Sequence, residues 1–303
     1  MIRFLENNEI NFIRWDNCIN NALNGNIFAF TWYLNIICDE WYGLILGDYE
    51  YVMPVIHRKF FNQKHLFTSP LAPQLGIYSK NLIDKKIVKK FIDTIPPEFS
   101  YIDINLNKYN PVESLDLIIR KRKTFELDLI QPAKKIKEKY TPLFKKELQL
   151  AKKQEITVLK GLLPNGLINF ALKKVNKYFP ILNKEDIQRL RMIIAFGLRY
   201  QIGEMYGAYN SNNELCAAAF FIKSKRKIHL MFSAINIEGE KSNALHKLID
   251  KYIELHAEKS LTLNLENICI TNKMDFLTGV GTLELNYINI RNKKLPWYIK
   301  LIK

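Results

Sequence analysis

The chain lacks most features that mark secreted, membrane-spanning or metal-dependent proteins. Its 303 residues include only 4 cysteines, and none are spaced as metal ligands or as a CxxC pair. Reduced, buried thiols in a cytoplasmic protein are therefore expected. The longest apolar run without a charge, 27–38, is too short for a transmembrane helix, which needs about 20 residues. The N-terminus has no long apolar stretch, so no signal peptide is expected.

The common catalytic motifs are also missing. The sequence contains no GxSxG, P-loop, HExxH or GxGxxG pattern. None of the 5 histidines is spaced as a metal ligand with another His, Cys or carboxylate. We therefore interpret each histidine as a structural or a surface residue, and we expect no bound metal ion. A Ser/His/Asp hydrolase stays open because its triad forms only in space, but nothing in the sequence supports one.

The chain does carry an excess of positive charge. It has 45 Lys+Arg against 30 Asp+Glu, a net charge of +15, which favours an anionic partner such as nucleic acid, a phosphorylated cofactor or a membrane surface. Within 120–153, twelve Lys/Arg stand against four Asp/Glu, a net +8. This concentration favours a local basic binding surface over a uniformly basic protein.

Hydrophobic periodicity predicts an α/β chain whose two halves repeat one element order: two helices, an antiparallel meander, then a helix and further strands. We expect an N-terminal domain over 1–131, a basic linking helix over 132–154 and a C-terminal domain over 155–303. The expected helices are 11–23, 32–39, 83–94, 132–154, 164–179, 183–200, 242–259 and one near Asp275. The expected strands are 41–46, 49–60, 64–68, 99–105, 124–129, 204–210, 214–223, 227–235, 261–266 and 285–291.

One strand-to-helix connection has the features of a phosphate site. The strand 227–235 ends in a short polar loop with Gly239, and Ser242 or a neighbour is placed to cap the next helix. The start of a helix after such a loop presents free backbone N–H groups that bind phosphate oxygens, and Lys241 adds positive charge. The alternative interpretation is an ordinary strand-to-helix turn.

Three further segments have two interpretations each. The loop 68–78 is stiffened by prolines and carries Gln74, so it is either structural or a binding loop. The aromatic residues in 32–51 favour core packing over a base-stacking platform. The apolar, basic tail 295–303 can dock on its own domain or make peripheral contact with a membrane.

A set of short segments follows a familiar order along most of the chain: 13–16, 31–35 with Trp41, 47–54, 69–79, 217–221, 233–236 and 295–296. Together they resemble the Fem-type (FemAB-like) acyltransferases of the GNAT (N-acetyltransferase) superfamily, in the branch common among Bacteroidetes. The resemblance implies two tandem GNAT-like domains, each a mixed, largely antiparallel sheet flanked by helices. It also implies transfer of an acyl or aminoacyl group to an amine of a cell-envelope precursor or small molecule. The donor would be acyl-CoA or, as in the peptidoglycan enzymes, aminoacyl-tRNA.

The resemblance also assigns roles, with the site placed in the cleft between the domains. Glu266 becomes the candidate base, and Tyr287 a candidate near the leaving thiolate. The chain differs from its branch at 265–268 and 280–282, and it lacks the coiled-coil arm of many aminoacyl-tRNA-dependent relatives. The implied donor-binding residues are Ser233, Asn236, Gly239, Lys241, Ser242 and Asn243, and the implied substrate-binding residues are Trp32, Tyr33, Arg58 and Gln74.

Two other hypotheses remain. The stretch 120–153 could make the chain a tRNA-binding or other nucleic-acid-binding protein, whose binding would fall steeply with salt. The single glycine of the phosphate loop could instead indicate a catalytically inactive GNAT-fold scaffold. The sequence predicts neither the acceptor nor the oligomeric state.

Overall fold

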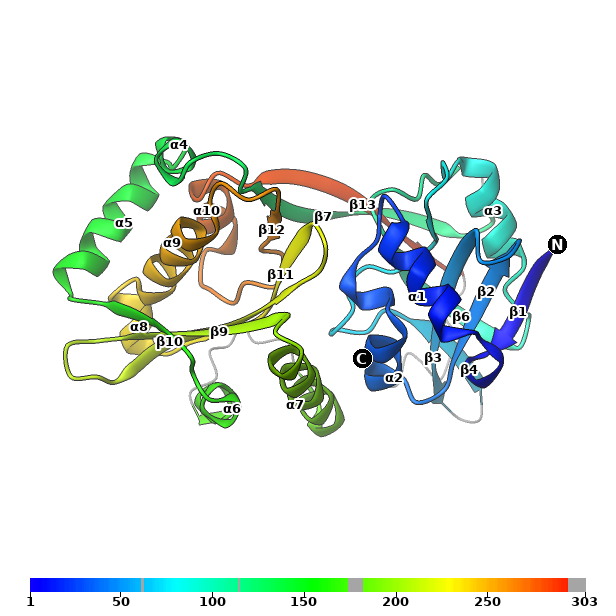
Figure 1. Cartoon of the computed structure of the whole chain (residues 1–303), viewed down its shortest axis with the longest axis horizontal. Helices are drawn as coiled ribbons and strands as arrows, with labels where there is room; N and C mark the ends of the chain where they lie inside the picture. Colours follow the sequence, from blue (N-terminus) through cyan, green and yellow to red (C-terminus); the bar gives the residue numbers. More distant parts are fainter. Residues whose placement is uncertain (61–62, 114, 174–181, 294–303) are drawn as a thin grey trace. The chain divides into compact units, whose positions relative to one another are not determined.

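The computed structural model describes residues 1–60, 63–113, 115–173 and 182–293. The chain divides into two compact units, each described by itself below (Figure 1). Unit 1 comprises Met1–Lys123 and Asn286–Lys303, and unit 2 comprises Thr124–Leu285. Unit 1 is thus completed by residues from the far end of the chain. The domain boundaries expected from the sequence, 1–131 and 155–303, stay a prediction.

Unit 1 is a mixed sheet with helices. Its strands follow the order β1-β2-β3-β4-β6-β13, with the short β5 paired to β3. All pairs are antiparallel except β4 with β6. The elements are β1 (Ile2–Glu6), η1 (Asn7–Glu9), α1 (Phe12–Asn21), η2 (Ile27–Ala29), α2 (Thr31–Ile37), β2 (Trp41–Leu46), β3 (Tyr51–Phe60), β4 (Gln63–Phe67), β5 (Tyr78–Ser79), α3 (Lys85–Asp93), β6 (Phe99–Leu106) and the start of β7 (Ile118–Asp128).

Unit 2 repeats this plan. Its strands follow the order β7-β12-β11-β10-β9-β8, and only β11 and β12 run parallel. The elements after β7 are α4 (Ala133–Glu138), α5 (Pro142–Lys153), β8 (Thr157–Lys160), α6 (Pro164–Lys173), α7 (Lys184–Arg199), β9 (Gly203–Tyr209), β10 (Leu215–Lys223), β11 (Lys227–Ile235), α8 (Ile237–Lys241), α9 (Ala244–His256), β12 (Thr262–Asn264), α10 (Lys273–Gly279) and β13 (Leu283–Arg291). The predicted α/β class, with mixed sheets flanked by helices, is confirmed.

The strand pattern of β2 explains how unit 1 is layered. Alternate residues of a strand point to opposite faces. Tyr42 and Leu44 pack in one core cluster with Phe91 of α3. Trp41 lies on the other face, where its ring meets Trp15 of α1 at 5.1 Å between centroids.

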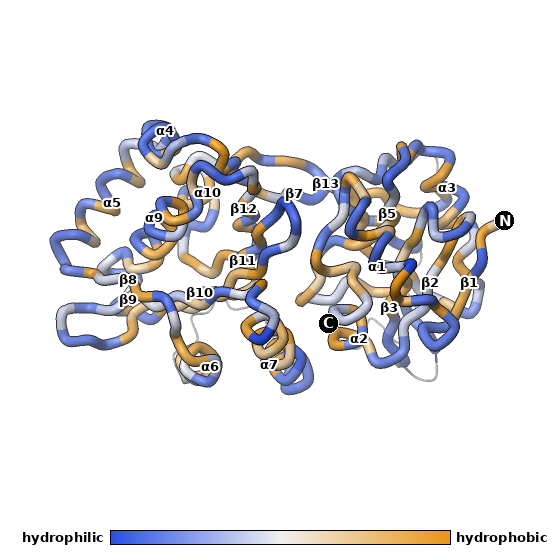
Figure 2. Tube along the Cα trace, viewed as in Figure 1, coloured by the Kyte–Doolittle hydropathy of each residue, from blue (hydrophilic) through white to orange (hydrophobic). Residues whose placement is uncertain are grey.

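In unit 2, one face of the sheet packs against α4, α5, α9 and α10 in a continuous hydrophobic core. Figure 1 shows α5, α9 and α10 on one side of β9–β11 and α6 and α7 on the other. β11 is buried from Ile228 to Ile235, whereas α4 is mostly hydrophilic (Figure 2). Leu245, Leu248 and Ile249 of α9 pack into this core.

The start of α7 agrees with the sequence-based prediction, whereas the region 132–154 differs from it. The helix predicted over 183–200 is present as α7 and begins with a capping box, in which the side chains of Asn183 and Asp186 accept each other's backbone N–H. The residues expected as a single basic helix, 132–154, form two helices. Thr141 caps the second one, and Pro142 follows at its first position, where proline is favoured but cannot continue a preceding helix.

Some predicted features fall outside the described residues. These are the end of the helix 164–179 and the tail 295–303, with the family match at 295–296. Among the residues that are described, no helix is both long and apolar enough to cross a membrane.

Candidate functional site

Each unit contains one parallel strand pair, and the two pairs end differently. In unit 2, β11 pairs with β12 only from Lys227 to His229. β11 then continues along β10 to Ile235, while β12 ends at Asn264. The two strands therefore separate, and a gap opens between their carboxyl ends, the edge at which open α/β sheets bind ligands.

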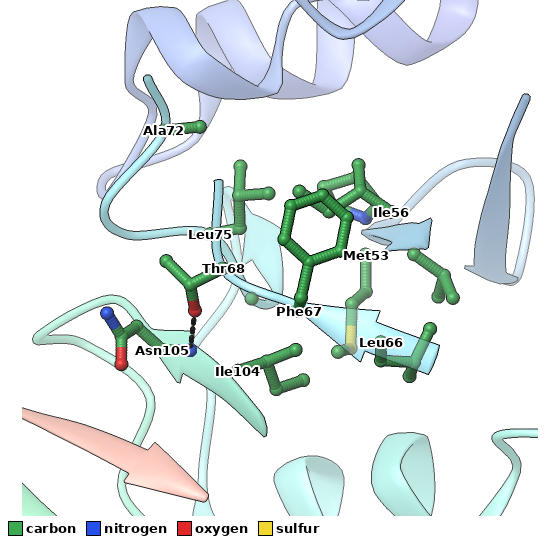
Figure 3. A pocket seen from close by; sticks show the side chains of 12 residues that line it. Met53, Ile56, Leu66, Phe67, Thr68, Ala72, Leu75, Ile104 and Asn105 are labelled. Carbon is green, nitrogen blue, oxygen red and sulfur yellow. Dashed lines mark hydrogen bonds between the residues drawn. The ribbon is translucent and has the colours of Figure 1, made fainter. Parts of the chain in front are cut away.

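In unit 1 the corresponding gap is filled by the loop after β4. Leu75 donates its N–H to Asn105 O and accepts from Asn107 N, so the loop continues the parallel pairing. Thr68 adds a hydrogen bond from Asn105 N to its hydroxyl, 2.8 Å long (Figure 3). The space that remains is about 20 Å³, close to one water molecule. This cavity is too small for a substrate.

Unit 2 has a pocket of about 360 Å³ at the carboxyl end of β11, within the size range of small-molecule sites. Its walls come from α5, the end of β11, the junction of α8 and α9, the segment 270–272 and the start of α10. The lining residues are Leu143, Glu147, Ile235, Glu240, Lys241, Asn243, His246, Ile270, Thr271, Asn272, Asp275 and Phe276.

A carboxylate–histidine pair lies in the wall of this pocket. Nε2 of His246, on α9, is 3.1 Å from Glu147 Oε2, on α5. The imidazole is 6% exposed and lies against the rings of Phe144 and Phe276, with centroids 5.2 and 4.8 Å away. Its other nitrogen, Nδ1, is buried and has no hydrogen-bond partner in the described part of the chain.

A second Glu–His pair in unit 2 shows what a structural pair looks like. Nε2 of His256 is 2.9 Å from Glu204 Oε2, and Nδ1 lies 2.9 Å from the carbonyl oxygen of Tyr252. Both ring nitrogens therefore have a partner, and neither residue lines the pocket. The Glu147–His246 pair differs on both points.

The predicted phosphate loop is occupied by the protein's own groups. Asn236 Oδ1 accepts the N–H of Gly239 at 2.7 Å, and Asn236 Nδ2 donates to Leu215 O. A Cβ on Gly239 would lie 2.2 Å from Cys216 O, so this position needs glycine for close packing. Ser242 is buried and donates its hydroxyl hydrogen to Glu238 O.

The start of α9 is the part of the predicted donor site that faces the pocket. Its N-cap residue, Asn243, has a left-handed backbone and makes no side-chain cap. Asn243 and the exposed Lys241 both line the pocket. Ser233 instead ties the two diverging segments together, because its hydroxyl accepts the N–H of Cys269 at 2.9 Å.

Glu266 lies two residues after β12 and does not line the pocket. Its carbonyl oxygen accepts a hydrogen bond from Lys273 Nζ. Burial lowers the pKa of the Lys273 ammonium, and the charge of Glu266 partly offsets this effect. The proposed role of Glu266 as a base stays a prediction.

The remaining predicted residues belong to unit 1. Tyr33 is fully buried and its hydroxyl donates to Leu71 O at 2.5 Å, so it supports the core. Arg58 is exposed and stacks over Phe67, 4.2 Å from the ring centroid. Trp32 is half-buried against the ring of Tyr33. The backbone carbonyl oxygen of Gln74 accepts a hydrogen bond from Asn26 Nδ2. Tyr287 is buried in β13.

The sequence indicated part of the pocket and missed the rest. It singled out Lys241 and Asn243, which lie in the lining. It missed Glu147, His246 and Asp275, because only the packing of α5 against both α9 and α10 brings them together. No group of three or more His, Cys, Asp or Glu placed to hold a metal occurs in the described ranges.

Comparison with known proteins identifies the fold. A scan against family models gives no match, and a search of curated proteins gives none either. Among solved structures, FemX aligns over 97% of this chain and 99% of its own, with a TM-score of 0.63 and 12% identity. A conserved protein of unknown function from Bacteroides thetaiotaomicron aligns over 96% and 99%, with a TM-score of 0.61 and 10% identity.

A third structure, L-PGS from Bacillus licheniformis, aligns over 96% of this chain and 94% of its own, with a TM-score of 0.54 and 9% identity. At these identities the likeness shows the fold alone. The resemblance to Fem-type proteins that the sequence indicates is therefore confirmed in the fold, which this chain shares with FemX.

Proposed function

We propose that the chain is an N-acyltransferase that moves an acyl or aminoacyl group to an amine, with its reaction site in the pocket of unit 2. The observation that carries this proposal is the difference between the two parallel strand pairs. The gap in unit 1 is filled to a cavity of about 20 Å³, whereas unit 2 has a pocket of about 360 Å³ with polar and charged walls at the carboxyl end of β11. The fold shared with FemX supports acyl transfer as the chemistry.

We propose that the donor is acyl-CoA and that its phosphates bind beside the start of α9. The start of α9 supports this placement because its first N–H groups have no side-chain cap, and a helix N-terminus attracts anions. Lys241 adds a positive charge beside it. In this proposal, Gly239 allows α8 to pack closely against β10, and it does not contact the phosphates.

Aminoacyl-tRNA is the alternative donor, and one observation favours it. Most lysines of α4 and α5, in unit 2, are exposed. A group of exposed cations within one unit is the electrostatic feature of a nucleic-acid surface. Glu266 and Tyr287, the base and leaving-group residue that the resemblance implies, lie outside the lining of this pocket. If the pocket is the reaction site, E266Q and Y287F should leave amide formation largely unchanged.

The donor is tested by thermal unfolding with a panel of CoA, acetyl-CoA, longer acyl-CoAs and aminoacyl-tRNA. We expect acyl-CoA to raise the melting temperature by several degrees at saturation, because a ligand that binds only the folded state stabilises it. K241E should lower the apparent affinity at least about tenfold, the equivalent of 1.4 kcal/mol. K251E is the matched control. Lys251 lies on α9, pairs with Glu254 and is not part of the pocket lining.

Two results would count against this assignment. A shift with tRNA alone, lost at high salt, would make aminoacyl-tRNA the donor. No shift and no amide product with any donor, from a folded protein, would favour an inactive scaffold.

A further inference from the structure

The charge of the pocket is opposite to that of the chain. The protein carries a net +15, yet the lining holds three carboxylates, Glu147, Glu240 and Asp275, against the single lysine Lys241. These carboxylates come from three different helices, α5, α8 and α10, so they are not neighbours in sequence. An acidic hollow in a basic protein favours a cation as its ligand.

The three carboxylates differ in how far the protein neutralises them. Glu240 accepts a hydrogen bond from the Thr271 hydroxyl at 2.6 Å. Glu147 faces His246, which offsets its charge only when the imidazole is protonated. Asp275 is exposed, and no ion pair with it is found in the described ranges. A ligand with a positive charge would supply the missing partner.

His246 is the second observation that points to a ligand. A buried imidazole nitrogen without a hydrogen-bond partner costs free energy. The Glu204–His256 pair avoids this cost, because both ring nitrogens of His256 have a hydrogen-bond partner. His246 keeps an unpaired Nδ1 in the wall of the pocket, and its Nε2 holds Glu147 at the lining. The pair therefore orients the Glu147 carboxylate and leaves its charge available.

We propose that this pocket binds its ligand through a positively charged amine held by Glu147, and that His246 is a positioning residue for that carboxylate. Within the N-acyltransferase proposed above, on which this role rests, the amine belongs either to the acceptor or to an aminoacyl donor. Both sources share the same chemistry, a primary ammonium group. Glu147 and Asp275 bind this ammonium, and the apolar side chains of Leu143, Ile235 and Phe276 contact its carbon chain.

The other charged groups that line the pocket with His246 and Glu147 are Glu240 and Lys241 from α8 and Asp275 from α10. An ammonium group at Glu147 therefore adds a positive charge among carboxylates, whereas a bound carboxylate would add to their mutual repulsion. The pocket should therefore distinguish ligands of similar size by the sign of their charge.

The test is an NMR titration of the histidine rings of the full chain with four small probes. The probes are n-butylamine, glycine ethyl ester, butyrate and n-butanol, of similar size but different charge. We expect the two amines, and not butyrate or butanol, to shift the His246 resonances saturably. His256 is the internal control and should not respond, because both of its nitrogens are already bonded.

Variants separate the positioning role from a merely structural one. E147Q should weaken butylamine binding at least about tenfold, and D275N, an exposed change that spares the fold, should weaken it by a smaller factor. H246Q, whose amide can still donate a hydrogen bond to Glu147, should keep most of the binding, whereas H246A should lose it as E147Q does. E138Q, on the exposed surface of α4, is the control.

The outcomes divide cleanly. Tighter binding of glycine ethyl ester than of butylamine assigns the amine to an aminoacyl donor, and the reverse order assigns it to the acceptor. Preference for butyrate, or no response of His246 to any probe, overturns the inference. Amine binding without amide formation from any acyl donor retains the inference and refutes the transferase function instead.

Discussion

Replacing Gly239 by alanine is expected to lower the free energy of unfolding by at least about 3 kcal/mol. The added Cβ would lie 2.2 Å from the carbonyl oxygen of Cys216 and 2.9 Å from its carbonyl carbon. Both are backbone atoms of the central strand β10, so they cannot turn aside as a flexible side chain would. The helix α8 would have to move away from the sheet, breaking the bond between Gly239 N and Asn236 Oδ1.

Urea unfolding of G239A beside G166A measures this effect. Gly166, in α6, has only the side chain of Leu162 near its Cβ position, at 3.3 Å. Alanine there should be neutral or stabilising by up to about 1 kcal/mol, because alanine is the better helix former. A stable G239A that merely loses donor binding would show that Gly239 serves as a phosphate contact after all.

Acidification should remove about 2–3 kcal/mol of stability through Glu204 alone. The hydrogen bond with His256 lowers the pKa of this carboxyl to about 2, from an ordinary value of 4.5, and a bond from Lys160 adds to the effect. A carboxyl whose pKa is lower in the folded state stabilises the fold above its unfolded pKa. This stability is complete above about pH 5 and is lost as the pH falls through 4.5 toward 2.

The measurement compares unfolding of the native chain and E204Q at several pH values. The difference in stability should be largest at neutral pH and shrink toward pH 2, where the native Glu204 is itself becoming neutral. E138Q is the control, because the Lys135–Glu138 pair is exposed and such pairs contribute little. A constant difference between the two proteins across this range would contradict the role given to Glu204.

The elements of the fold could largely be predicted from the chain because their signals are local. The meander strands β9 to β11, the turn after β2 and the capping box at Asn183 all depend on residues within a few positions of one another. The short strands β1, β5 and β8 were missed, since their pairing with distant partners, and not their own pattern, makes them strands. The break at Thr141 was missed because lysine-rich periodicity continues across it.

The sequence by itself determined that this is an α/β protein with two similar halves and a basic middle stretch. The segment before α9 that it predicts as a polar loop forms the short helix α8. Only the tertiary structure decided where a ligand can bind. It filled the gap of unit 1 with the loop after β4, and it occupied the Gly239 turn with Asn236 and the backbone of β10. It also brought Glu147, His246 and Asp275 from three helices to one pocket. Such contacts depend on packing between segments distant in sequence, and no local pattern encodes them.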